Sequence, residues 1–252
     1  MDIASLNAAA AASRESSQTR VRGSADAAAQ AFQKADQRLQ QQRNQVSVEV
    51  SAVGKSKSAF SDAQLAAAAL NDPKQTVTDA GVTKAANNFV KAFNAATKTT
   101  RSAASPKGLL AGANLAQAAE RSLLSTISAD STAKSELKKI GIVQQNDGAL
   151  ALDARKFEAA LKVNSEAVRS TLSSIGAQVD RTATRELANT GNLGKSASSL
   201  DSRARNLENQ QATQQAQAAA AQQTMSTRTA DLNKSLNNLN TGAAAYQRVF
   251  SL

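Results

Sequence analysis

Large apolar residues recur every seven positions between residues 24 and 70, and this spacing constrains the fold more than any other feature of the sequence. The recurring residues are Phe32, Leu39, Val46, Val53 and Phe60. Residues seven apart lie along one side of an α-helix and form the seam of a coiled coil. The positions three residues later hold small or polar side chains: Ala35, Gln42, Glu49, Ser56 and Ala63. Because so thin a seam buries little area, we expect this helix to need a partner helix or an assembly.

The predicted bounds of this long helix are residues 24 and 70. Ser24 or Asp26 can cap its N-terminus, and Pro73 disfavours helix in the residue before it. Residues 1–23 have no sustained hydrophobic period, so we expect a flexible N-terminal tail there. Aromatic residues make up 3% of the chain, which has two prolines. The predicted fold class is therefore mainly α, with long N- and C-terminal helices that form a coiled coil and one small β element.

A connector over residues 71–81 leads to a compact helical region predicted over residues 82–177. Its first helix presents an apolar face made of Val82, Ala86, Phe89, Phe93 and Ala96, whose steps of four and three are helical. Asp147 and Gly148 stand between two short apolar runs, which predicts a β-hairpin over about residues 140–152. Asp153 and Ser165 can each cap a following helix. The prediction is a helical bundle that carries one hairpin.

The C-terminal helices, predicted over residues 178–252, carry apolar residues at heptad spacing in two runs. Leu193, Leu200 and Leu207 form the first run, and the second consists of Met225, Leu232, Leu239 and Tyr246, supported by Leu236 and Phe250. Eighteen residues separate Leu207 from Met225, four more than two heptads. We interpret this offset as a stutter, which locally unwinds a coiled coil. We expect the last long helix to pair weakly with the helix over residues 24–70.

The predicted coiled-coil or assembly interface consists of the seam residues of these two helices. They are Phe32, Leu39, Val46, Val53, Phe60, Leu200, Leu207, Met225, Leu232, Leu236, Leu239, Tyr246 and Phe250. An ordinary intramolecular core without an assembly role is the alternative that the sequence leaves open.

Several functional classes are not expected. Histidine and cysteine are absent, which excludes disulfides, thiolate sites and His-containing catalytic groups. We predict no enzymatic activity, no cofactor and no small-molecule substrate. Asp147 and Asp153 allow a calcium interpretation, but the residues between them supply no further oxygen side chains, so a turn and a helix cap are favoured.

No membrane span or cleaved signal is expected either. No apolar run approaches the ~20 residues that cross a bilayer. The sequence MDIASLNAAAAAS has an acid at Asp2 and no basic region, unlike a Sec signal. We expect the protein either to stay inside the cell or to be exported without a cleaved signal.

The net charge of +10 makes an anionic partner worth considering. The basic residues are scattered, however, and the densest groups are isolated pairs such as Arg20 with Arg22. No aromatic residues are interleaved with them. A solvated helix surface is therefore favoured over a nucleic-acid interface.

Three segments resemble the flagellar hook-associated protein 2, or filament-cap, family. The segment VSAVGKSKSAFSDAQLAAAALND is similar to the end of that family's first long helix, and AANNFVKAFNAATKTT is similar to its helix with Phe-Val and then Asn after an aromatic residue. The segment LKKIGIVQQNDGALALDARKFEAALKVNSEAV resembles its hairpin and following helix. A stretch over residues 194–208 and a C-terminal helix also stand where the family has them.

The resemblance implies a structural assembly protein of the bacterial flagellum, at the filament cap or the hook-filament junction. It implies export by the flagellar type III pathway, a homo-oligomer, and flagellin or hook-associated subunits as partners. The family's plate domains would lie between the first long helix and the Phe-Val helix, where this chain has only the connector over residues 71–81. Two alternatives remain open: an intracellular alanine-rich coiled-coil module that binds an anionic surface or nucleic acid, and a type III secretion tip or translocator protein.

Overall fold

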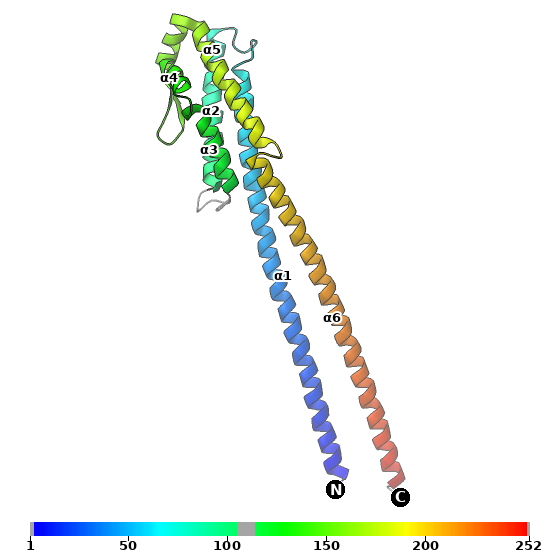
Figure 1. The fold of residues 1–252 in the computed structure, drawn as a ribbon. Coiled ribbons are helices and arrows are strands. Elements are labelled where there is room, and N and C mark those ends of the chain that lie inside the picture. Colours follow the sequence, from blue (N-terminus) through cyan, green and yellow to red (C-terminus); the bar gives the residue numbers. More distant parts are fainter. Residues whose placement is uncertain (1–2, 105–113, 251–252) are drawn as a thin grey trace. The chain divides into compact units, whose positions relative to one another are not determined.

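The computed structural model of this chain describes residues 3–104 and 114–250 (Figure 1). The helices are α1 (Ile3–Ala69), α2 (Asp79–Ala104), α3 (Asn114–Ser128), α4 (Ser131–Lys139), α5 (Ala154–Leu187) and α6 (Asn192–Phe250). Two short strands, β1 (Ile142–Gln144) and β2 (Leu150–Leu152), form one antiparallel sheet. The predicted fold class is thus confirmed: the described chain is mainly α, with long first and last helices and one small hairpin.

Contacts divide the chain into two compact units. The bundle unit covers residues 45–204, and the terminal unit combines the chain up to Asn44 with the chain from Arg205 onward. The bundle unit contains α2 to α5, the hairpin, the C-terminal part of α1 and the first turns of α6. The terminal unit contains only the remaining parts of the two long helices.

The main core of the bundle unit lies where α1, α2, α3, α5 and the hairpin meet. Its largest fully buried side chains are Phe60 on α1, Phe89 and Phe93 on α2, and Phe157 on α5. The face that the sequence predicts for the first helix of the compact region is buried along its whole length in α2. The core then continues along α5 and reaches the first turn of α6 at Leu193.

A second, smaller apolar cluster lies in the same unit. It consists of Ala52, Val53, Ala104, Ala116 and Leu200. Along α1, the fully buried Ser56 falls between Val53 of this cluster and Phe60 of the main core, and Thr100 takes the equivalent place on α2. The hydroxyl oxygens of both residues are buried without a hydrogen-bond partner. Small polar side chains thus stand between the two apolar clusters.

The hairpin forms where the sequence predicts it. Ile142 pairs with Leu152 and Gln144 with Leu150. The turn closes through the Gln145 N–H, which donates to the Ala149 carbonyl at 2.8 Å, and Gly148 has φ +83°. Glycine suits this position because other residues rarely adopt positive φ. The predicted cap at Asp153 is also confirmed, since its side chain accepts a hydrogen bond from the Lys156 N–H.

The structure differs from the prediction at three helix boundaries. First, α1 begins at Ile3 rather than at Ser24 or Asp26, because alanine favours helix and an exposed Gly23 costs only about 1 kcal/mol. Second, a separate helix, α4, precedes the hairpin, capped by Asp130. Third, the cap predicted at Ser165 is Asn164, which has non-helical φ and ψ and accepts from the Ala167 N–H. The flexibility predicted for residues 1–23 stays a prediction.

The close approach of α1 and α5 requires a glycine at position 176 in the bundle unit. A Cβ atom at Gly176 would lie 2.5 Å from the carbonyl oxygen of Ala67. Because no side chain fits in that space, Gly176 lets the two helix backbones pack directly. A hydrogen bond from the Gln64 Nε2 to the Thr184 Oγ1, 2.7 Å long, joins the same two helices further along.

Candidate assembly surface

The seam on α1 keeps its heptad frame in both units, but its burial differs between them. In the bundle unit Val46, Val53 and Phe60 are buried, and Phe60 is fully buried. In the terminal unit Leu39 is buried, whereas Phe32 is half-buried. This heptad position is therefore buried throughout the bundle unit but incompletely covered at Phe32 in the terminal unit.

The seam on α6 has one unbroken heptad frame, so the stutter interpretation is wrong. Half-buried residues fill the interval between Leu207 and Met225 at steps of three and four: Gln211, Gln214, Ala218 and Ala221. In the heptad lettered a to g, position d is followed four residues later by the next a. Eighteen residues are therefore two heptads plus one step from d to a. The heptad-spaced large apolar residues therefore occupy d positions up to Leu207 and a positions from Met225 onward, and the phase of the helix does not change.

Polar side chains on the two seams meet across the helix pair and define its orientation. In the terminal unit, a guanidinium nitrogen of Arg43 donates to the Gln211 Oε1, while Phe32, nearer the N-terminus, lines a groove with Ala218. In the bundle unit, Glu49 and Arg203 form an ion pair with a nitrogen to oxygen distance of 3.4 Å, and Val53 shares an apolar cluster with Leu200. Within each unit the paired parts of α1 and α6 therefore run antiparallel (Figure 1).

The terminal unit leaves its apolar residues incompletely covered. Of the side chains described there, only two large apolar ones are buried, Leu39 and Leu207. The predicted interface residues Met225, Leu232 and Leu236 are half-buried, and Leu239 is 61% exposed. The side chains of Tyr246 and Phe250 lie outside the described residues. A groove of about 280 Å³, lined by residues that include Phe32, Asp36 and Gln214, runs between the two helices.

The groove contains a polar atom that the helix pair does not satisfy. The Oε1 of Gln214 is buried and has no hydrogen-bond partner. Leaving a buried acceptor unpaired costs on the order of 1–3 kcal/mol. Thin apolar seams and this unsatisfied amide oxygen together mean that the two-helix pair is only weakly stable by itself.

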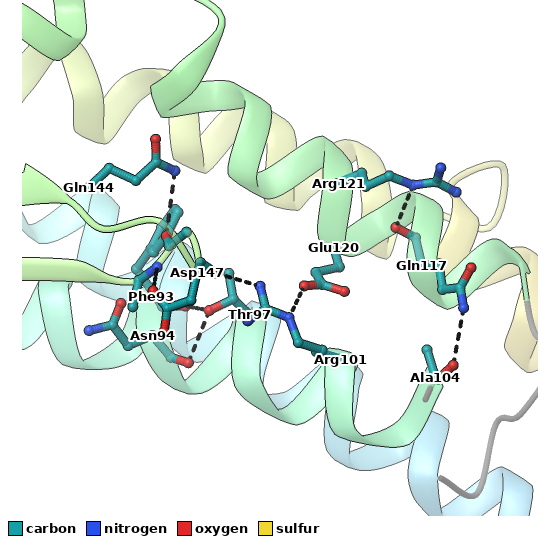
Figure 2. Close-up of polar contacts among 12 residues, drawn as sticks. Phe93, Asn94, Thr97, Arg101, Ala104, Gln117, Glu120, Arg121, Gln144 and Asp147 are labelled. Carbon is teal, nitrogen blue, oxygen red and sulfur yellow. Dashed lines mark hydrogen bonds and ion pairs between the residues drawn. The ribbon is translucent and has the colours of Figure 1, made fainter. Parts of the chain in front are cut away.

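Side chains of α2 clamp the hairpin of the bundle unit onto the helices (Figure 2). The Asn94 Nδ2 donates to the Leu150 carbonyl at 2.8 Å, and the Leu150 N–H donates to the Asn94 Oδ1 at 2.7 Å. In an antiparallel pair, residues that are not bonded to each other point their N–H and C=O groups outward. Asn94 thus satisfies both outward-pointing backbone groups of Leu150 in β2.

Arg101 joins three elements at the turn of the hairpin. Its Nε donates to the Glu120 Oε1 of α3 at 2.6 Å, and its Nη2 donates to the Asp147 carbonyl at 2.8 Å. Figure 2 shows Arg101 between these two partners. The Glu120 side chain is mostly buried, and a buried carboxylate needs such a charged partner.

The two aspartates considered for calcium serve the backbone instead. Asp147 accepts from the Ala149 N–H in the turn, and Asp153 caps α5. Among the residues that the structure describes, no group of three or more acidic, histidine or cysteine residues could hold a metal ion. Over the same residues, each helix is too short or too polar to span a bilayer.

The sequence pattern did not predict the clamp formed by Asn94, although this residue lies in one of the segments that resemble the family. Asn94 is the asparagine that follows an aromatic residue in AANNFVKAFNAATKTT. Its partner, Leu150, lies 56 residues away, and no local pattern predicts that pairing. The asparagine at the edge of the apolar face of α2, next to Phe93, was the available signal, since a half-buried polar side chain needs a partner.

Comparison with known proteins identifies the family of the chain. A family model described as "Flagellar hook-associated protein 2 C-terminus" matches residues 75–248, more than half of the 252 residues. No curated protein matches the chain. The matched range contains the clamp and all of α2 to α5, together with nearly all of α6. The chain therefore belongs to the flagellar hook-associated protein 2 family, a family of structural proteins of the flagellar cap.

Proposed function

We propose that this protein acts at the filament cap or the hook-filament junction, and that its terminal helices hold it there. The terminal unit would pack against further helices, supplied by other copies of the chain and by flagellin or hook-associated subunits. The protein would reach this place by flagellar type III export. It would catalyse no covalent chemistry.

The incomplete burial of the terminal unit carries this proposal. Met225, Leu232, Leu236 and Leu239 lie on one side of α6, and none of them is fully buried by the facing part of α1. Burial releases about 25 cal/mol for each Å² of apolar surface. A third helix laid on this side would cover these residues and the adjoining groove, so assembly would supply the burial that the single chain lacks.

The proposal also assigns a role to the bundle unit. The described residues between α1 and α2 form a tight turn, in which the Gln75 N–H and Thr76 N–H donate to the Asp72 carbonyl. Since the family's plate domains would be inserted there, we propose that this chain supplies the legs of the cap without the plate. The bundle unit would then be a rigid element that spaces neighbouring subunits.

The test replaces three seam residues and compares them with three residues on the outward face of the same helix. The seam variant carries Leu232→Asp, Leu236→Asp and Leu239→Asp. The control carries Ser226→Asp, Asn233→Asp and Asn237→Asp, all at exposed positions. Both add three negative charges, but only the seam variant places them where a partner helix would bury them.

The measurement is the amount of each variant in sheared flagellar filaments, together with immunogold labelling of whole flagella. We expect the seam variant to be lost from the flagellum and the control to be retained. Thermal unfolding of the bundle unit, measured in the purified full chain, should be the same for both variants. Equal incorporation of the two variants would contradict assembly through this seam, and absence of the unaltered protein from flagella would contradict the proposed location.

A further inference from the structure

A polar groove on the bundle unit lies apart from both the helix seams and the hairpin clamp. It has a volume of about 410 Å³ and lies between α3 and α5. Ser122, Ser125 and Thr126 line one side, and Gln178, Arg181 and Arg185 line the other. The lining on each helix extends over two turns, which corresponds to a length of about 10 Å.

The two arginines place positive charge along the groove, and among the described residues only Arg185 of the two has an ion pair, with Glu186. They are four residues apart on α5, so their side chains leave the helix from neighbouring positions about 5–6 Å apart. Arg181 forms no ion pair with a described residue. Arg185 donates to the Ser122 Oγ at 3.3 Å, which aims its guanidinium across the groove toward α3.

The two nearby carboxylates also accept hydrogen bonds from groups outside the groove. Asp130, at one end of the groove, accepts from the N–H groups of Thr132 and Ala133 as the cap of α4. Glu186 forms an ion pair with Arg185 at 3.9 Å through one oxygen, and its other oxygen accepts from the backbone and side chain of Asn192. Like charges four apart on a helix repel each other, so a bound pair of anionic groups would remove a repulsion as well as form new contacts.

We infer that this groove binds an acidic helix of a different protein through a pair of carboxylates. Two carboxylates three or four residues apart on a helix have the same spacing as Arg181 and Arg185, and an arginine fork matches a carboxylate with two parallel hydrogen bonds. Binding of a helix in a groove is a common mode of recognition, and here polar and charged contacts would replace the usual apolar ones. The hydroxyl groups and the Gln178 amide on the groove walls can pair with further polar groups of that helix.

The sequence itself excludes a second copy of this chain as the occupant. None of its 20 acidic residues has another acidic residue three or four positions away. The chain therefore has no helix that presents the required carboxylate pair, and its net charge of +10 opposes self-association through a basic groove. This inference goes beyond the proposed function and does not depend on it.

The experiment titrates the full chain with helical peptides of about 20 residues, long enough to hold helical structure. One alanine-rich peptide carries a Glu pair at i and i+4, a second carries Gln at both places, and a third carries the Glu pair at i and i+2, on different faces. We expect only the first to bind measurably, and its affinity should fall as salt rises from about 0.05 to 0.5 M, because salt screens exposed charges.

Substitutions then locate the site. Arg181→Gln and Arg185→Gln should each weaken binding of the first peptide about three- to fivefold, and the double variant about tenfold or more. Arg121→Gln is the matched control, because Arg121 is exposed on α3, outside the groove, with its Nε on the Gln117 carbonyl. It should leave the affinity unchanged. NMR shifts of the Gln178 side-chain amide and the Ser125 N–H in the unaltered protein provide a readout that needs no variant.

Three results would overturn the inference. One is equal affinity for the Glu and Gln peptides. Another is a loss of affinity in Arg121→Gln as large as in Arg181→Gln. The third is a combined result: inorganic phosphate saturates the groove and depends on the same arginines, and the two Glu peptides bind with equal affinity. The groove would then be an anion site that does not recognise a helix.

Discussion

The bundle unit and the terminal unit use the same seam of α1 in different surroundings. In the bundle unit, Phe60 at position a meets side chains of α2 and α5 and is fully buried. In the terminal unit, the described residues that line the groove with Phe32, at the same heptad position, come from α1 and α6, and Phe32 remains half-buried. The heptad repeat therefore fixes which face of α1 is apolar, whereas the number of partner helices decides how much that face contributes to stability.

The largest expected difference comes from removing the same side chain in both units. Phe60→Ala should lower the free energy of unfolding of the bundle unit by about 3–5 kcal/mol, because it leaves a cavity in a packed core. Phe32→Ala should change that free energy by about 0.5 kcal/mol or less, since a half-buried residue outside the bundle contributes little to it. Hydrogen exchange of the α2 amides at increasing urea concentration measures both effects. Similar losses in the two variants would show that the two units unfold together.

The next largest effect is expected at the contact between α1 and α5. Gly176→Ala should destabilise the bundle unit by about 1–3 kcal/mol, because the new methyl group would meet the Ala67 carbonyl and overpacking strains both helices. Gly54→Ala is the matched control: a Cβ there meets nothing within 4 Å, and it should stabilise α1 by about 1 kcal/mol. Thermal unfolding followed by circular dichroism compares them. A Gly176→Ala protein as stable as the unaltered chain would mean that the two helices can separate without loss.

Local patterns predicted those parts of the structure that depend on neighbouring residues. The spacing of Val82 and Phe93 predicted the buried face of α2, and Asp147 with Gly148 predicted the hairpin turn, because period and turn chemistry are local properties. Patterns misplaced the start of α1, where helix propensity outweighs a single glycine. The α6 stutter was an error of a different kind. The d positions between Leu207 and Met225 are occupied by glutamine and alanine, and a heptad search that follows only large apolar residues does not see them.

Contacts between distant segments could not be predicted. Asn94 pairs with Leu150 and Arg101 with Glu120, and neither pairing follows from spacing. The same holds for the apolar cluster that joins Val53 to Ala104 and Leu200. That cluster places Val53 in the bundle unit as well as on the seam. A charge at Val53 would thus disturb the bundle itself, which makes Leu232, Leu236 and Leu239 the better positions for a test of assembly.

A smaller effect is expected from the clamp of the hairpin. Asn94→Leu should destabilise the bundle unit by about 2 kcal/mol, because two hydrogen bonds are lost and the N–H and C=O groups of Leu150 are left unpaired. The exchange rate of the Leu150 N–H should rise more than that of amides in α5. Asn88→Leu, at an exposed position of the same helix, controls for the added apolar surface. Unchanged exchange at Leu150 would show that the sheet pairing holds this edge without Asn94.

The smallest effect concerns the two hydroxyl groups between the apolar clusters of the bundle unit. Ser56→Ala should stabilise the bundle by about 1 kcal/mol, because the Ser56 hydroxyl is fully buried without a partner and a buried unpaired polar group is costly. Ser58→Ala, two residues away at an exposed position of α1, should change stability by about 0.5 kcal/mol or less. Thermal unfolding of the two variants measures the difference. A loss of stability in Ser56→Ala would mean that an ordered water between the clusters satisfies the hydroxyl. This layer would then be a hydrated part of the core. The bundle unit, like the terminal unit, would in that case bury its apolar seam incompletely.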